Sequence, residues 1–233
     1  MAVIRTAKVA LPVNGNGAYA YVAQPDDDQT HPGLVMIQEW WGIEPHVIDL
    51  AHKLAEEGFI VAVPDLFHGK VATEPNDAER MMMMVTSNVE RAIQEILGAL
   101  NTLRKMPMVE PKQLGVIGFC MGGFLAMKVA SRYPELGAVV AFYAAGFEPT
   151  PEEVQALNVP VLAIYGSQDA STPPETIANI ERAYKEAGKD VTVQVYNAGH
   201  AFINPDHGDY REEAATQAWP QAIQFLKEHL RYE

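Results

Sequence analysis

The chain has 233 residues, 48% of them hydrophobic, so it can bury a full core, and we predict a single domain covering residues 1–233. Its net charge of −13 at pH 7 disfavours nucleic acids and anionic membranes as partners, because both would be repelled. It contains no run of about 18 apolar residues, which argues against a membrane-spanning helix.

The first predicted element is a β-hairpin. Two strand-like runs, Ala7–Val13 and Ala18–Ala23, flank the segment Asn14-Gly15-Asn16-Gly17. Asn and Gly readily adopt the positive φ that tight hairpin turns require. We therefore expect an antiparallel hairpin to open the sheet.

After the hairpin, short apolar runs alternate with longer stretches of helical periodicity. This alternation is typical of a mostly parallel sheet with helices on both faces, so we predict an α/β fold of about eight strands. The predicted strands are Leu34–Ile37, Phe59–Val63, Leu114–Ile117, Ala138–Phe142, Val161–Tyr165 and Val191–Tyr196. The predicted helices lie near Pro45–Glu57, Asn76–Lys105, Gly122–Arg132, Pro173–Ala187 and Tyr210–Leu230.

Two of the predicted helices carry local signals. Thr172-Pro173-Pro174-Glu175 has the pattern of a capping box with proline at the first helical position. Four consecutive methionines, Met81 to Met84, would point in all directions around a helix. Core packing is the favoured interpretation of this run, and a pliable pocket wall is the alternative.

The only cysteine lies in the segment Gly118-Phe119-Cys120-Met121-Gly122-Gly123, between a predicted strand and a predicted helix. This is the context of a nucleophile elbow, in which small neighbours let the strand and helix approach and the nucleophile has a strained backbone. The N–H of Met121 would then face an oxyanion formed on the sulfur. The alternative is a buried structural thiol. A dinucleotide-binding loop is excluded because position 120 is not glycine.

Two further residues follow neighbouring predicted strands. Asp169 comes shortly after Val161–Tyr165, and His200 comes shortly after Val191–Tyr196. Ligands of open parallel sheets bind beyond the carboxyl ends of the strands, so these side chains should lie near Cys120. The order Cys120, Asp169, His200 predicts a catalytic triad, although each residue alone could be an ordinary loop residue.

Glu39 follows the strand Leu34–Ile37. A carboxylate there would oppose an oxyanion, so we interpret it as a partner that takes the proton of the Cys120 thiol when substrate arrives. The neighbouring N–H of Trp40 would complete the oxyanion hole. A salt-bridged surface glutamate is the alternative.

No metal site or cofactor is predicted. The six remaining histidines show no paired ligand spacing such as H-E-x-x-H. They are His31, His46, His52, His68, His207 and His229.

Taken together, these segments resemble the dienelactone hydrolase (carboxymethylenebutenolidase) family, a cysteine branch of the α/β-hydrolase fold. The resemblance implies Cys120, Asp169 and His200 as triad, Glu39 as activator of the thiol, and the N–H groups of Trp40 and Met121 as oxyanion hole. It also implies hydrolysis of an enol-lactone through a cysteinyl acyl-enzyme. The segments that carry it are Gln38-Glu39-Trp40-Trp41-Gly42, Pro64-Asp65-Leu66, Gly118 to Gly123, Tyr143, Gly166-Ser167-Gln168-Asp169 and Gly199-His200-Ala201-Phe202.

The substrate is less defined than the reaction. Members of this family that act on dienelactone hold its carboxylate with two arginines, one of them four positions after the catalytic histidine, where this chain has Asn204. Arg80 could correspond to the other arginine. An apolar pocket, which also suits neutral or aromatic esters, is predicted by Trp40, Trp41, Tyr143, Phe202 and the methionine run.

We therefore predict a hydrolase of enol-lactones or esters, with a carboxylesterase for small neutral or aromatic esters as the alternative. A redox-responsive thiol protein is a further alternative, but no second cysteine could resolve a sulfenic acid within the chain. With one cysteine and no apolar signal-peptide core in Met1–Lys8, we expect a cytoplasmic location. We also expect a monomer, because a sheet of this size covered on both faces needs no partner to close its core.

Overall fold

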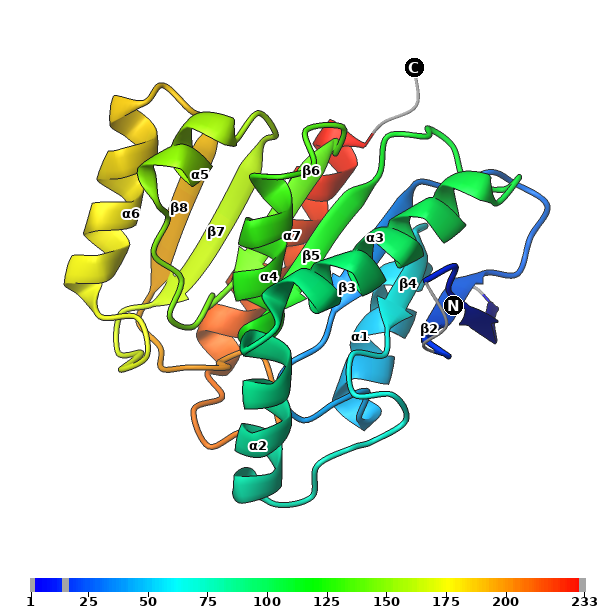
Figure 1. Cartoon of the computed structure of the whole chain (residues 1–233), viewed down its shortest axis with the longest axis horizontal. Coiled ribbons are helices and arrows are strands. Elements are labelled where there is room, and N and C mark those ends of the chain that lie inside the picture. Colours follow the sequence, from blue (N-terminus) through cyan, green and yellow to red (C-terminus); the bar gives the residue numbers. More distant parts are fainter. Residues whose placement is uncertain (1–2, 14–16, 231–233) are drawn as a thin grey trace. The chain divides into compact units, whose positions relative to one another are not determined.

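The structure is a computed structural model, and it describes residues 3–13 and 17–230. Its eight strands form a mostly parallel sheet in the order β1-β2-β4-β3-β5-β6-β7-β8, with helices around it (Figure 1). This confirms the predicted α/β fold class. The strands are β1 (Ile4–Ala10), β2 (Tyr19–Pro25), β3 (Gly33–Ile37), β4 (Ile60–Pro64), β5 (Gly115–Phe119), β6 (Ala138–Phe142), β7 (Val161–Gly166) and β8 (Val191–Tyr196).

Helices follow most of the strands in the chain, as the alternating pattern predicts. None in the described part of the chain is long and apolar enough to span a membrane. The helices are α1 (Pro45–Glu56), α2 (Pro75–Thr86), α3 (Val89–Lys105), α4 (Met121–Ala130), α5 (Pro151–Ala156), α6 (Pro174–Glu186) and α7 (Glu212–His229).

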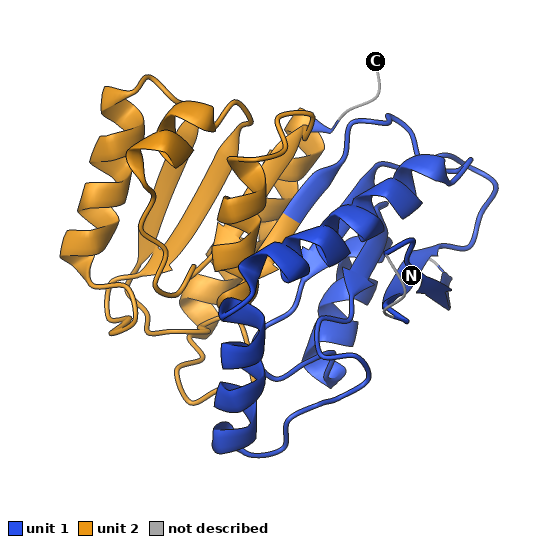
Figure 2. Cartoon of the chain, viewed as in Figure 1, with its two compact units in different colours: residues 1–116, 230–233 blue, residues 117–229 orange. Residues whose placement is uncertain are grey.

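The chain divides into two compact units (Figure 2). Unit 1 comprises residues 1–116 and 230–233, and unit 2 comprises residues 117–229. The boundary falls within β5, so each unit takes part of this strand. That the chain acts as one domain stays a prediction.

Unit 1 contains the antiparallel part of the sheet. β1 pairs with β2 from Ile4↔Pro25 to Ala10↔Tyr19, which confirms the predicted hairpin. Its predicted turn falls largely on residues 14–16, which lie outside the described residues. β2 is also antiparallel to β4, whereas β3 and β4 are parallel. β3 and β4 are buried throughout, as their apolar sequences require.

Unit 2 contains the parallel strands that carry the candidate site. β6, β7 and β8 pair in parallel, and every residue of β6 and β7 is buried. α4 lies in front of β6 and α7 behind it in Figure 1, so this strand is covered on both faces. β8 is less buried than its neighbours because it is the last strand of the order.

One predicted helix is in fact two. The stretch Asn76–Lys105 is interrupted after α2, and α3 begins anew at Val89. The interruption is stabilised by Asn88, whose side-chain oxygen accepts a hydrogen bond from the N–H of Arg91 at 3.2 Å. Asparagine favours this N-cap position because it satisfies a helical N–H that has no carbonyl partner.

The predicted capping box at Thr172 is wrong. The N-cap of α6 is Pro173, which makes no side-chain cap, and the hydroxyl of Thr172 donates instead to the carbonyl of Ala144 at 3.4 Å. A complete capping box is found at α5, between Thr150 and Glu153, where the sequence analysis did not place one. The tertiary contact of Thr172 therefore outweighs its local pattern.

The methionine run does not fill the core. α2 buries only Ala78 and Val85, and none of the four methionines is buried. Met83 and Met84 are 59% and 71% exposed. The favoured interpretation of core packing is therefore wrong, and the alternative of a pocket wall is taken up below.

Candidate active site

Cys120 occupies a strained turn between β5 and α4. Its backbone has φ 55° and ψ −116°, a conformation that a non-glycine residue rarely adopts. A Cβ added to Gly118 would lie 2.1 Å from the carbonyl oxygen of Gly122, so the backbones touch where the strand meets the helix. Only glycine at position 118 allows this approach. The expected strained elbow is therefore present.

The imidazole of His200 bridges the thiol and a carboxylate. Its Nε2 lies 3.0 Å from Sγ of Cys120, and its Nδ1 lies 2.7 Å from Oδ2 of Asp169. Both are hydrogen-bond distances. Cys120 and Asp169 are also buried, at 7% and 2% exposed. The three predicted triad residues therefore form one hydrogen-bonded series.

The loops after β7 and β8 hold Asp169 and His200 in place. A Cβ on Gly166, the last residue of β7, would lie 2.3 Å from the carbonyl oxygen of Ala198, so the two loops are in backbone contact. The N–H of Gln168 also donates to the carbonyl of Ala198 at 2.9 Å. This is why residues 31 positions apart in the sequence meet at the carboxyl ends of neighbouring strands.

The surroundings of His200 favour its protonated form. Burial by itself lowers its pKa, but the hydrogen bonds to Asp169 and Cys120, with their negative charges, outweigh this and raise the pKa to about 10. Burial alone would raise the pKa of Asp169, yet His200 and Ser171 lower it overall. An imidazolium between two acidic partners is therefore the stable resting arrangement.

Ser171 is a site residue that the sequence analysis missed. Its hydroxyl donates to Oδ1 of Asp169 at 2.6 Å, and its backbone N–H donates to the same oxygen at 2.8 Å. Its Oγ also lies 3.2 Å from Nδ1 of His200. The spacing Asp-x-Ser is a common turn pattern and could have suggested the first contact but not the second.

One aromatic side chain lies against the histidine, and a second packs on the first. Tyr143 lies edge-on to the His200 ring at 5.2 Å between centroids, and Phe202 lies 5.6 Å from Tyr143. Both are fully buried, and Tyr143 has the unusual φ of 36°. Their predicted contact with substrate stays a prediction. The ring of Tyr143 gives the imidazole an apolar neighbour beside its polar partners.

Asn204 belongs to a turn of its own. It is 3% exposed, and its side-chain oxygen accepts a hydrogen bond from the N–H of Asp206 at 3.0 Å. This neutral amide therefore has a structural partner in the chain. Whether it also contacts substrate stays a prediction.

Met121 is the first residue of α4. The first N–H groups of a helix have no carbonyl partner within it, and they lie at the positive end of the helix dipole. The backbone at this position is therefore suited to stabilise negative charge beside Cys120.

The other predicted site residues belong to unit 1. Glu39 is 2% exposed, and Trp40 and Trp41 lie edge to face with centroids 5.2 Å apart. Arg80 is exposed and pairs with Asp77 on the same helix. The roles of these four residues stay predictions.

Over residues 3–13 and 17–230, no cluster of three or more His, Cys, Asp or Glu side chains is arranged to hold an ion. The hydrogen-bonded series can transfer a proton between sulfur and imidazole and keep the imidazole oriented.

Comparison with known proteins places the chain in a family. The model of the dienelactone hydrolase family matches residues 18–230. "Protein usf" of Aquifex pyrophilus is 32% identical over 224 residues, covering 93% of this chain and 96% of that protein. "Putative carboxymethylenebutenolidase" of Aquifex aeolicus is 30% identical over 228 residues, covering 94% and 96%.

A solved structure agrees with these relatives. The crystal structure of "Putative Dienelactone Hydrolase" from Klebsiella pneumoniae has a TM-score of 0.87 and 26% identity, covering 97% of this chain and 99% of that one. The chain thus belongs to the dienelactone hydrolase family and is a hydrolase by that membership.

Proposed function

We propose that this protein hydrolyses enol-lactone or other carboxylic ester bonds through a covalent intermediate on Cys120. The observation that carries the proposal is the hydrogen-bonded series from Cys120 through His200 to Asp169, on a strained turn at the start of α4. This arrangement fits nucleophilic catalysis because each neighbour can activate or orient the next group.

In the resting pair the thiol proton already lies on Nε2 of His200, which agrees with the raised pKa of the imidazole. In the first half-reaction, the thiolate of Cys120 bonds to the carbonyl carbon of the substrate. The carbonyl π electrons move to oxygen and form an oxyanion, which the N–H of Met121 would stabilise. The carbonyl then re-forms as the ester C–O bond breaks, and His200 gives its proton to the departing oxygen. A thioester on Cys120 remains.

In the second half-reaction, water loses a proton to His200 and attacks the thioester carbon. The C–S bond breaks, the acid is released, and the pair of Cys120 thiolate and His200 imidazolium is restored. Asp169 stays ionised throughout and stabilises the imidazolium that forms in each half-reaction, which agrees with its lowered pKa.

Glu39 and the N–H of Trp40 keep the roles that the sequence suggests, as a second acceptor of the thiol proton and a second oxyanion donor. The variant Glu39→Gln tests the first of these roles. An activity–pH profile identical to that of the wild type would remove Glu39 from the mechanism.

The decisive test compares hydrolysis of dienelactone and p-nitrophenyl acetate by the wild type and Cys120→Ala. Loss of the thiol should lower kcat for both substrates by roughly 10³-fold or more. Ser131→Ala is the matched control, because it removes another small buried side chain near the end of the same helix. Retained hydrolysis in Cys120→Ala would overturn the proposal, whereas an acetyl adduct on Cys120 after acid quenching would support it.

A second candidate function is esterase activity on small neutral or aromatic esters. It is favoured by Asn204, whose uncharged amide is buried and bonded to Asp206, and by the aromatic ring of Tyr143 beside His200. A wild type that prefers p-nitrophenyl acetate to dienelactone would favour this substrate class over the lactone. The thiol mechanism would be the same.

A further inference from the structure

Unit 1 contains a cleft that neither the triad nor the family assignment explains. It is formed by residues 66–70, which follow β4, by the C-terminal half of α2 and by the first turns of α3. Its cavity volume is about 160 Å³. We call it the α2–α3 cleft. All of its lining residues belong to unit 1, and its proposed role does not depend on the proposed hydrolase function.

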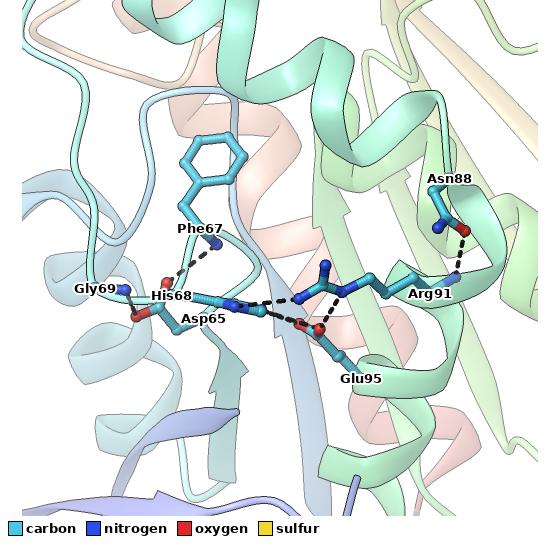
Figure 3. Close-up of polar contacts among 7 residues, drawn as sticks. All are labelled: Asp65, Phe67, His68, Gly69, Asn88, Arg91 and Glu95. Carbon is cyan, nitrogen blue, oxygen red and sulfur yellow. Dashed lines mark hydrogen bonds and ion pairs between the residues drawn. The ribbon is translucent and has the colours of Figure 1, made fainter. Parts of the chain in front are cut away.

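One wall of the cleft contains a buried carboxylate with basic partners (Figure 3). Glu95 is 2% exposed, and both of its oxygens lie 3.0 Å from Nε2 of His68. Nε of Arg91 donates to the same carboxylate at 3.3 Å, and an Arg91 terminal nitrogen lies 3.4 Å from Nδ1 of His68. A buried ion pair adds little stability compared with apolar packing, so its main effect here is to orient the two basic side chains.

The turn that carries His68 is fixed by hydrogen bonds within the protein. The carboxylate of Asp65 accepts hydrogen bonds from the N–H groups of Phe67 at 3.2 Å and Gly69 at 2.6 Å. His68 has φ 54° and Gly69 has φ 87°, so the turn holds a histidine in the left-handed region. Because this turn is already ordered, ligand binding would not incur the entropy cost of ordering the His68 side chain.

Positive charge exceeds negative charge in the lining. Arg91 and Lys70 are cationic, and Glu95 is the only acidic residue of the lining. Lys70 makes no side-chain ion pair or hydrogen bond with any residue that the structure describes, and the guanidinium of Arg91 is only partly used by Glu95. In a chain with a net charge of −13, this local excess of positive charge suits an anion.

Apart from Asn88, the remaining lining is apolar. Leu66, Phe67, Val85 and Ala92 are buried, and Met84 lines the cleft although it is 71% exposed. Methionine is common at binding surfaces that adapt to their ligand, so an exposed methionine beside an apolar cavity suits a ligand site. A dry cavity of about 150 Å³ is large enough to bind benzene, so this cleft has the volume for one six-membered ring.

We propose that the α2–α3 cleft binds a small organic carboxylate with an apolar body of about one ring. The ring would lie among Phe67, Val85 and Met84, and the carboxylate would face Arg91 and Lys70. The ligand needs both an apolar ring and a negative charge for tight binding, because the apolar cavity and the cationic side chains line the same cleft.

The test uses benzoate as the probe and the full chain labelled with [methyl-¹³C]methionine. Met81 and Met84 line the cleft, so their methyl resonances report binding directly, and Met81→Leu and Met84→Leu assign them. We expect saturable shifts of these two resonances with a Kd on the order of 1 mM, which suits a ligand of this size. Acetate, which lacks the ring, and benzamide, which lacks the charge, should each bind about tenfold more weakly or worse.

The matched variants are Arg91→Gln and Arg182→Gln. Each removes one exposed arginine, but Arg182 lies on α6 and does not line the cleft. Arg91→Gln should weaken benzoate binding about tenfold or more, and Arg182→Gln should leave it unchanged. Lys70→Gln provides an independent second test if Arg91→Gln folds poorly.

Three results would overturn the proposal. Benzoate could leave the Met81 and Met84 methyl resonances unmoved, benzamide could bind as tightly as benzoate, or folded Arg91→Gln and Lys70→Gln could both bind benzoate like the wild type.

Discussion

His200 is the residue whose protonation connects the candidate site to the stability of the fold. It hydrogen-bonds the thiol through one nitrogen and a buried carboxylate through the other. These contacts raise its pKa from 6.5 to about 10 despite its burial. The folded protein therefore holds a proton on this imidazole at pH values where the unfolded chain has released it.

The stability of the protein should reflect this pKa. A raised folded-state pKa gives stabilisation that is complete below the unfolded pKa and is lost as pH rises through the folded pKa. We expect the free energy of unfolding contributed by His200 to decrease between pH 6.5 and about 10. Urea unfolding at several pH values should show this decrease in the wild type and not in His200→Gln. Parallel pH curves for the two proteins would contradict the assignment.

Ser171 acts on the triad through Asp169. Its hydroxyl and its N–H both donate to the carboxylate and help to lower the pKa of that group. Ser171→Ala keeps the N–H bond, so we expect about a tenfold decrease in kcat/KM rather than complete loss. The acidic limb of the activity–pH profile should move to higher pH, because Asp169 becomes easier to protonate.

Two further variants distinguish a role of Ser171 in positioning Asp169 from a general disturbance of the loop. Ser171→Thr retains the hydroxyl and should restore most of the activity. Ser167→Ala, in the same loop, should leave the pH profile unchanged. If Ser171→Ala lowers activity without moving the acidic limb, Ser171 does not act through the carboxylate.

At the scale of elements, the close approach of β5 and α4 sets the geometry of the thiol. Gly118 and Gly122 touch through their backbones, and a Cβ on Gly123 would lie 2.5 Å from the carbonyl oxygen of Phe142. Backbone atoms cannot rotate away as a flexible side chain can. The elbow is therefore specified by glycines as much as by the cysteine.

Gly118→Ala should destabilise the fold by about 3 kcal/mol or more, because the new methyl group would meet a backbone carbonyl at 2.1 Å. Gly208→Ala is the control, since no heavy atom lies within 4 Å of the corresponding Cβ. Urea unfolding, or soluble yield where the variant does not fold, measures the difference. Equal stability of the two variants would show that β5 and α4 separate at little cost.

The break between α2 and α3 should depend on its cap. Asn88→Ala removes the acceptor for the N–H of Arg91 and should lower stability by about 1 kcal/mol. Asn101→Ala, at an exposed position within α3, should have no comparable effect. The Tm values of the two variants in thermal unfolding measure this difference. An unchanged Tm in Asn88→Ala would exclude a stabilising cap.

At the scale of the whole molecule, the net charge of −13 affects which substrates approach. An anionic substrate such as dienelactone is repelled by this charge, whereas p-nitrophenyl acetate is neutral. Added NaCl screens the repulsion. We expect kcat/KM for dienelactone to rise with salt from low ionic strength while that for p-nitrophenyl acetate stays constant. A fall with salt would mean that local positive charge controls the encounter.

The sequence alone predicted the fold class and all the parallel strands, because buried strands must be apolar and the spacing between them leaves room for helices. It also predicted that Asp169 and His200 meet near Cys120, since parallel strands present their carboxyl ends at one edge of the sheet. These outcomes follow from composition, periodicity and chain order.

Other features depend on contacts between distant segments and were decided only by the tertiary structure. Thr172 bonds to Ala144 rather than capping its helix, and the methionine run faces a cleft and solvent rather than the core. The pairing of Glu95 with His68 joins residues 27 positions apart that share no motif. Local patterns state what a residue can do, and the packing of other segments around it determines which possibility is realised.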